Sequence, residues 1–352
     1  MSSKFIQQIK IYVLFPVILI PVLSISQKDT SVIILEKEFI FEKVPFLSCH
    51  ASTIAETPKG LVAAWFGGTE ENNPDVEIWI SRKENNIWTA PVSVANGIQD
   101  SSKRFPCWNP VLFQYPNGPL LLFYKVGPDP TSWWGELITS NDNGNTWSKP
   151  KRLPQEILGP IKDKPVLLND GRLICPSSVE SKEGSWTIHL EITADLGKTW
   201  TSSVALNDGK QYHLIQPSLL IFPNQKLQLL CRSMENKVMT LWSYDNGKTW
   251  SPPSPTNLPN PNSGIDAVSL KNGLQLLVYN PTEKTKENWG GPRSKLSAAL
   301  SKDGISWKDV LVLEDEPGEF SYPAVIQSRD GSIHITYTWK REKIKHVAIK
   351  LN

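Results

Sequence analysis

The sequence predicts an all-β protein, a six-bladed β-propeller of four-stranded antiparallel blades. Three observations predict this fold. A short aromatic-ended turn phrase recurs along the chain, six apolar hairpins follow one another at similar spacing, and one strand is left over near the N-terminus. Repeats with a period of about 50 residues indicate an array of identical supersecondary units. The length of 352 residues is compatible with one closed array of this kind.

The turn phrase has the pattern Ser/Thr-x-Asp-x-Gly-x-Thr-Trp. It stands in full at 140–147, 193–200 and 243–250 and in shortened form at 301–307. Its Asp can accept backbone N–H bonds across the turn, its Gly supplies positive φ, and its Trp folds back over the hairpin. We therefore expect each copy to close a β-hairpin, with the Asp shaping the turn rather than holding a ligand.

Six hairpins, each an apolar strand, a polar turn and a second apolar strand, make the inner halves of the blades. They span residues 51–66, 109–124, 164–178, 216–232, 265–280 and 322–339. Each is followed by a second hairpin, which gives six four-stranded blades. The last blade lacks an outer strand, and segment 32–43 can supply it. This pairing would close the ring and remove an open edge.

The first 26 residues predict a signal peptide. Lys4 and Lys10 precede an apolar run at 11–23, and small residues follow it. The run is too short and too rich in Pro for a transmembrane anchor. We therefore expect residues 1–26 to be removed and residues 27–352 to form a single propeller, secreted or periplasmic and without a membrane partner after cleavage.

Composition excludes several classes of partner. The net charge is +2 and no acidic or basic block stands out, so no nucleic-acid partner is expected. Cys49, Cys107, Cys175 and Cys231 could form the pairs 49–107 and 175–231, or could remain buried free thiols. No set of Cys, His, Asp or Glu residues has metal-ligand spacing. We expect a monomer without metal or cofactor.

The functional residues are expected at one mouth of the propeller's central channel. Each inner strand starts on this face, and each second strand returns to it. The positions concerned are Cys49, His50, 67–75, Trp108, Asn109, Lys164, Glu180, Gln216, Arg232, Asp266, Asn280, Glu319, Tyr322 and Trp339. The set is polar, aromatic and mixed in charge, which suits a carbohydrate (glycan) substrate.

The turn phrase is the Asp-box of the BNR repeat, and through it the sequence resembles the sialidase (neuraminidase) superfamily. The resemblance covers the chain after residue 26 as a fold. It implies an exo-acting glycoside hydrolase in which three arginines clamp a carboxylate, an Asp protonates the leaving group, and a Tyr attacks with a Glu as its base. A Tyr nucleophile suits an anionic sugar, because a carboxylate nucleophile would repel it. Asp-boxes also occur in non-enzymatic propellers, so they identify the fold better than the activity.

Several positions match what this family implies. Arg232, at the end of a second strand, resembles the second clamp arginine, and Arg293, just before an Asp-box strand, resembles the third. The loop 67–75 leaves the first blade where the family keeps its acid. We expect Asp75 to be that acid, since crowding among the carboxylates of this loop would raise a pKa.

Other positions depart from the family. His50 stands beside the place of the first clamp arginine, and as a donor or acid/base it could substitute for it. Gln216, an amide, stands near the place of the Glu base, so we expect it to bind substrate. Phe320 occupies the expected nucleophile position. Tyr322, with Glu319 as its partner, is therefore the expected nucleophile in a shifted register, and Tyr337 is the alternative.

Three functions remain open at this stage. The first is an exported hydrolase of the sialidase type acting on a terminal acidic sugar. The second is a polysaccharide lyase for uronate sugars, with His50 and a Tyr as base and acid. The third is a non-catalytic carbohydrate-binding propeller, in which Trp133, Trp134, Trp289 and Trp339 would stack on the sugar.

Overall fold

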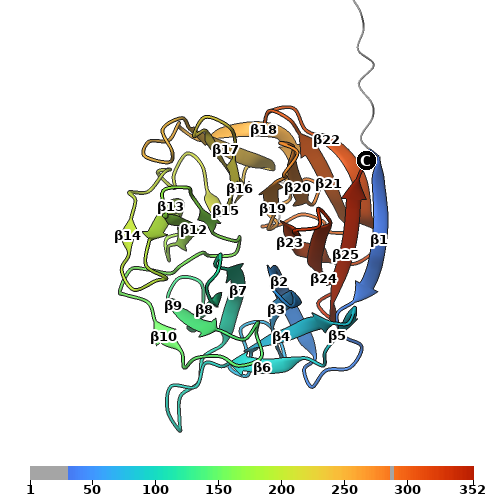
Figure 1. The fold of residues 1–352 in the computed structure, drawn as a ribbon. Coiled ribbons are helices and arrows are strands. Elements are labelled where there is room, and N and C mark those ends of the chain that lie inside the picture. Colours follow the sequence, from blue (N-terminus) through green and yellow to red (C-terminus); the bar gives the residue numbers. More distant parts are fainter. Residues whose placement is uncertain (1–30, 286–288) are drawn as a thin grey trace, which may run out of the picture. The chain divides into compact units, whose positions relative to one another are not determined.

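Six antiparallel sheets surround a central axis as the blades of a propeller (Figure 1). The structure is a computed structural model that describes residues 31–285 and 289–352. The predicted signal peptide, residues 1–26, lies outside the described residues. No described helix is long and apolar enough to cross a membrane. The prediction of an all-β, six-bladed propeller is confirmed.

The first three blades are built from strands that follow one another in the chain. Blade 1 contains β2 (Ser48–Thr57), β3 (Gly60–Gly68), β4 (Glu77–Glu84), β5 (Ile87–Trp88) and β6 (Val92–Ala95). Blade 2 contains β7 (Cys107–Gln114), β8 (Leu120–Val126), β9 (Trp134–Ser140) and β10 (Lys151–Arg152). Blade 3 contains β11 (Val166–Leu167), β12 (Leu173–Glu180), β13 (Trp186–Thr193) and β14 (Thr201–Ser202). In blade 1 the outer position is shared, because β5 and β6 both pair with β4.

The last three blades repeat the plan, and the sixth closes the ring. Blade 4 contains β15 (Leu214–Ile221), β16 (Leu227–Ser233), β17 (Lys237–Ser243) and β18 (Ser254–Pro259). Blade 5 contains β19 (Asp266–Ser269), β20 (Gln275–Tyr279), β21 (Lys295–Ser301) and β22 (Lys308–Asp315). Blade 6 contains β23 (Phe320–Gln327), β24 (Ile333–Trp339), β25 (Lys343–Leu351) and, from the other end of the chain, β1 (Val32–Phe39). Pairing of β1 with β25, from Val32↔Leu351 to Phe39↔Lys345, confirms the predicted closure.

The Asp-boxes act as turns, as predicted. In the first, Asp142 accepts hydrogen bonds from the backbone N of Thr146 (2.8 Å) and from its hydroxyl (2.7 Å). These donors, with Ser140, lower the pKa of Asp142 to about 2. Gly144 takes a φ of 86°, which only glycine adopts freely. The carboxylate is therefore engaged in hydrogen bonds within its own turn.

The core lies between neighbouring blades, because both faces of most strands are buried. One apolar cluster, for example, joins blades 1 and 2 through Val62, Ile78, Leu112 and Leu122. The four cysteines are buried free thiols, so the disulfide pairs considered from the sequence do not form. Burial raises the pKa of Cys49, which leaves its thiol protonated.

Candidate active site

Four inner strands carry a β-bulge close to their first residues. The register shifts fall at His50/Thr53, Trp108/Val111, Ile215/Pro217 and Ser321/Ala324. Within them, positive φ values occur at Ala51 (54°), Asn109 (35°), Gln216 (51°) and Tyr322 (51°). A bulge re-aims side chains, and left-handed non-glycine residues cluster at functional sites. The inner strands therefore turn selected side chains toward one end of the propeller axis.

Tyr322 is at the centre of the resulting cluster. Its phenolic oxygen accepts hydrogen bonds from Arg232 Nη1 at 2.7 Å and Gln216 Nε2 at 3.3 Å. Its ring centroid lies 4.1 Å from that of His50 and 5.9 Å from Arg293 Cζ. The cluster thus joins blades 1, 4 and 6 with the segment that leads into β21. Four of the site residues expected from the sequence contact the ring or hydroxyl of the expected nucleophile.

Within residues 31–285 and 289–352, the hydrogen-bond partners of Arg232 are neutral. Besides Tyr322, its guanidinium donates to Asn262 Oδ1 at 2.8 Å and to Gln216 Oε1 at 3.2 Å. The rings of Trp186 and Trp289 lie 5.7 and 5.4 Å from its Cζ. The side chain is buried, so this cation is desolvated without a carboxylate bonded to it. A bound anion would compensate it.

Arg341 is a third arginine in the cluster, and the sequence analysis missed it. It lies in the turn between β24 and β25, and its carbonyl oxygen accepts a bond from the backbone N of Cys49 at 2.8 Å. It therefore reaches the start of the first inner strand, where the family resemblance expected an arginine. Lys340 and Arg341, in the three-residue turn 340–342, have φ values of 54° and 61°, a region that favours Gly and Asn. The sequence signal that could have revealed Arg341 is a hairpin turn that contains two bulky cationic residues.

Two carboxylates brace these arginines. Glu319 Oε1 lies 3.1 Å from both Arg293 Nη1 and Arg341 Nε, and Glu71 pairs with Arg341 Nη1. Burial alone would raise the pKa of Glu319, but Arg341, Arg293 and Ser321 lower it overall, so this group is ionised. In the described part of the chain, three guanidinium groups face two carboxylates that are bonded to them. The cluster therefore has an excess of positive charge that suits an anionic ligand.

Because Glu319 pairs with Arg293 and Arg341, its carboxylate is directed toward the arginines. Its third hydrogen bond comes from the Ser321 hydroxyl, at 2.7 Å. The structure brings it to Arg293 and Arg341, with no hydrogen bond to Tyr322 among the described residues. Tyr337, the alternative nucleophile, donates from β24 of blade 6 to Glu314 on β22 of blade 5 at 2.6 Å and is fully buried.

His50 is neutral in this environment. Burial lowers its pKa well below the usual value, and the surrounding cations, first Arg341 and Arg293, lower it further. Its Nδ1 lies 2.9 Å from the Thr338 hydroxyl. His50 can therefore act as a hydrogen-bond donor or acceptor, but it adds no positive charge to the cluster.

Asp75, the expected acid of the loop 67–75, is bonded within its own loop rather than to the arginine cluster. Its carboxylate accepts bonds from the backbone N of Thr69 (3.1 Å) and from the Thr69 hydroxyl (2.5 Å). With Phe46, Trp79 and Arg104 it lines a hollow of about 270 Å³. The carboxylate of this loop that is bonded to the arginine cluster is Glu71.

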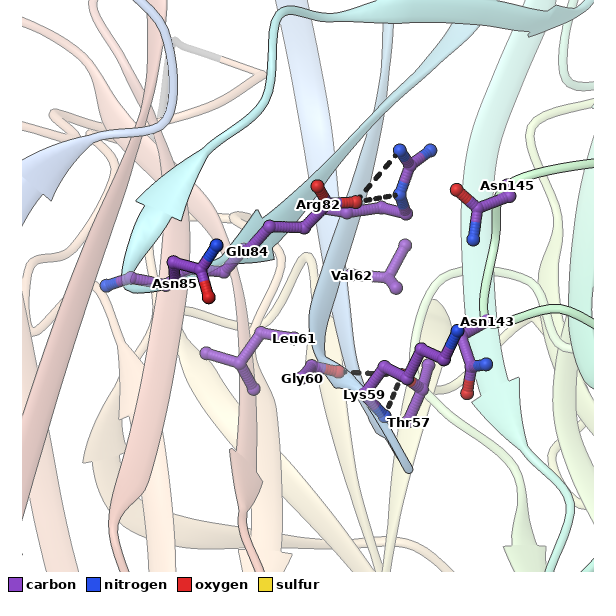
Figure 2. Close-up of a pocket in the computed structure, with 11 residues that line it drawn as sticks. Thr57, Lys59, Gly60, Leu61, Val62, Arg82, Glu84, Asn85, Asn143 and Asn145 are labelled. Carbon is purple, nitrogen blue, oxygen red and sulfur yellow. Dashed lines mark hydrogen bonds and ion pairs between the residues drawn. The ribbon is translucent and has the colours of Figure 1, made fainter.

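A larger pocket, of about 400 Å³, lies at the opposite ends of the blade strands (Figure 2). Figure 2 shows Thr57 and Gly60 of the β2–β3 turn facing Asn143 and Asn145 of the Asp-box loop. Along β2, Thr57 is roughly 20 Å from His50 at the strand rise of about 3.3 Å per residue. Arg82 is already bonded to Glu84 and to the Gly144 carbonyl there. We therefore assign the functional site to the arginine cluster.

The fold and the Asp-boxes define a propeller of the BNR type. The family model of the BNR repeat-like domain matches residues 59–335, and the chain belongs to this family. No curated protein sequence matches the chain.

Solved structures share the fold at low identity. A protein of unknown function from Dyadobacter fermentans superposes with a TM-score of 0.75 at 17% identity, covering 92% of this chain and 100% of its own. Trypanosoma rangeli sialidase gives 0.67 at 16%, covering 86% of this chain and 55% of its own. The K499G mutant of NanB sialidase from Streptococcus pneumoniae gives 0.69 at 13%, covering 89% and 71%. These likenesses establish a sialidase-like fold, and this chain spans only part of the two sialidases.

Proposed function

We propose that the protein is a glycoside hydrolase of the sialidase type that removes a terminal acidic sugar. The observation that carries the proposal is Tyr322, a strained aromatic residue whose phenolic oxygen accepts a 2.7 Å bond from Arg232 inside the arginine cluster. Arg232, Arg293 and Arg341 bind the substrate's acidic group through charge-assisted hydrogen bonds. Their excess positive charge and the desolvation of Arg232 support this assignment.

Tyr322 acts as the nucleophile in this proposal. Its oxygen attacks the anomeric carbon as the phenol loses its proton, and the bonds from Arg232 and Gln216 stabilise the negative charge that deprotonation places on that oxygen. Asp75, from the loop 67–75, protonates the leaving group. His50 and Gln216 contact the bound sugar. The protein acts as an exported monomer on glycans and uses no metal or cofactor.

The test is turnover of 4-methylumbelliferyl glycosides of N-acetylneuraminic acid, glucuronic acid and neutral sugars. We expect cleavage of an acidic glycoside and none of the neutral ones. Trypanosoma rangeli sialidase forms a covalent intermediate with 2,3-difluorosialic acid. The same reagent, or the fluoro analogue of the cleaved sugar, should label Tyr322, as detected by peptide mass spectrometry. Absence of cleavage across the panel contradicts the proposal.

A uronate lyase is the second candidate, and one observation favours it. The ring of a neutral His50 lies beside that of Tyr322, tilted by 50°, while Gln216, rather than a carboxylate, contacts the phenol. His50 and Tyr322 would then serve as base and acid in a β-elimination, with the arginines neutralising the carboxylate. A lyase releases an unsaturated uronate that absorbs in the ultraviolet, and a hydrolase does not. Binding of acidic sugars without either product would indicate the non-catalytic alternative.

A further inference from the structure

Glu180 is a carboxyl group at the edge of the arginine cluster. It is the last residue of β12 and lies opposite Trp186 across the β12–β13 pair. The side chain is half-buried, and no hydrogen bond or ion pair engages it within residues 31–285 and 289–352. Arg232 is the charged group that acts on it. Glu71 and Glu319 are held by ion pairs to the arginines, whereas Glu180 is not, so its carboxyl group is available to accept a proton.

The strand geometry sets the direction of this side chain. Ser178, two residues earlier, accepts a bond from the backbone N of Gln216 at 3.3 Å. Residues i and i+2 of a strand point to the same face, so Glu180 lies on the face of β12 that meets blade 4. Blade 3 and blade 4 are neighbours in the ring, with β12 beside β15, which pairs with β16 (Figure 1). Gln216 is on β15 and Arg232 is on β16, and both donate to Tyr322.

Among the described residues, no carboxylate is bonded to the phenolic oxygen of the nucleophile. Gln216 donates to the phenolic oxygen of Tyr322, and an amide cannot take its proton. Glu319 is ionised but bonded to Arg293 and Arg341. Burial raises the pKa of Glu180, with Arg232 lowering it in part, and a carboxylate with a raised pKa is a stronger base.

We propose that Glu180 is the base that accepts the phenolic proton of Tyr322 and so replaces the carboxylate that Gln216 does not provide. This inference rests on the proposed hydrolase function. The Tyr322 O–H bond breaks and its proton moves to Glu180, across a hydrogen bond or one bridging water, while the phenolic oxygen bonds to the anomeric carbon. The glycosidic C–O bond breaks, and the leaving oxygen takes the proton of Asp75. Water then releases the sugar, giving a proton back to Asp75, and Glu180 returns its proton to the phenolate.

The test compares Glu180→Gln with the parent protein and with Glu183→Gln, an exposed carboxylate three residues away in the β12–β13 turn. On the acidic glycoside that the parent cleaves, Glu180→Gln should lower kcat about 10²- to 10⁴-fold, and Glu183→Gln should leave it unchanged. The parent's kcat/KM should fall on the acid side at a pH above the usual glutamate pKa of about 4.3. This limb should disappear in the Glu180→Gln protein.

A rescue variant separates a base from a structural residue. Gln216 already contacts both Arg232 and Tyr322, so Gln216→Glu in the Glu180→Gln background places a carboxylate at the phenol and should restore much of the lost rate. Glu180→Asp guards against misfolding of the first variant. The Glu180→Asp protein should fold, have a lower kcat and keep the acid limb of the pH profile. Its carboxylate is retained, but the side chain is one methylene shorter.

The outcomes separate this inference from the proposed function. If the parent cleaves an acidic glycoside and Glu180→Gln or Glu180→Asp matches its kcat and pH profile, Glu180 is not the base and the hydrolase assignment stands. Loss of rate that Gln216→Glu fails to rescue also overturns the assignment. A parent that cleaves no glycoside in the panel overturns both proposals together.

Discussion

Replacing Glu38 by Gln should weaken the closure of the ring measurably. Glu38 lies on β1, and its Oε1 accepts bonds from Lys83 Nζ (2.6 Å), Trp88 Nε1 (2.7 Å) and His346 Nδ1 (2.9 Å). One carboxylate therefore joins the closing strand to β4 and β5 of blade 1 and to β25 of blade 6. Because the first and last parts of the chain meet here, the contact stabilises the whole ring.

The magnitude follows from the pKa of this carboxyl group. Burial raises the pKa of Glu38, but its hydrogen bonds outweigh burial and lower the pKa from 4.5 to about 2. A shift of this size corresponds to about 3 kcal/mol. The side chain is 26% exposed, so solvent screening reduces this to about 2 kcal/mol. Since the folded pKa is depressed, the stabilisation is fully present above about pH 4.5 and is lost as the pH falls toward 2.

Urea unfolding followed by tryptophan fluorescence measures this directly. At pH 7, Glu38→Gln should lower the free energy of unfolding by about 2 kcal/mol. Glu84→Gln, at the end of β4 in blade 1 and half exposed, is the control and should change it by less than about 1 kcal/mol. At pH 3 the difference between parent and Glu38→Gln should shrink. A Glu38→Gln protein as stable as the Glu84→Gln control, or a difference that persists unchanged at pH 3, would refute the reasoning.

Four further predictions concern the candidate active site and the place where β1 closes the ring. Arg232→Lys keeps the charge but not the planar fork, so calorimetry should show about 2 kcal/mol, or roughly 30-fold, weaker binding of the acidic sugar, and unchanged binding would contradict the clamp. Tyr322→Phe should abolish turnover and leave binding within a few fold, whereas full activity would exclude it as nucleophile. Asp75→Asn should slow unactivated glycosides more than 4-methylumbelliferyl ones, and equal losses would argue against an acid. Glu36, Glu38 and His346 lie close enough together to hold a metal ion, but Lys83 pairs with both carboxylates, so a chelator should leave Tm unchanged, and a fall would indicate a bound metal.

The repeats and turns could be read from the sequence because they depend on local chemistry. The Asp142 turn is satisfied within a few residues, so its pattern fixes its structure wherever it occurs. The alternation of apolar residues identified six inner hairpins in the same way. Even the closing pair of β1 with β25 was predictable, since counting strands left one segment without a partner and one blade without an edge.

Parts of the site could be predicted for a related reason. Arg232 and Arg293 stand at fixed places relative to strand ends, and Tyr322 begins an inner strand. Their positions in the blade repeat therefore placed them near the mouth. Their partners did not follow from the repeat. Glu319 was expected beside the phenol, but it pairs with Arg293 and Arg341 instead.

Only the tertiary structure decided which side chains meet. Arg341 reaches the start of the first inner strand from the last hairpin, and Glu71 reaches Arg341 across the seam between the two ends of the ring. Glu180 faces Arg232 because two blades of the ring are neighbours. Such contacts join residues far apart in sequence, and the bulges at Gln216 and Tyr322 turn side chains in ways that strand periodicity does not encode. The sequence by itself determined the blades and their order, because hairpins form from local turn chemistry and alternation. The chemistry of the mouth depended on ring closure, because closure brings the ends of six separate blades to one axis.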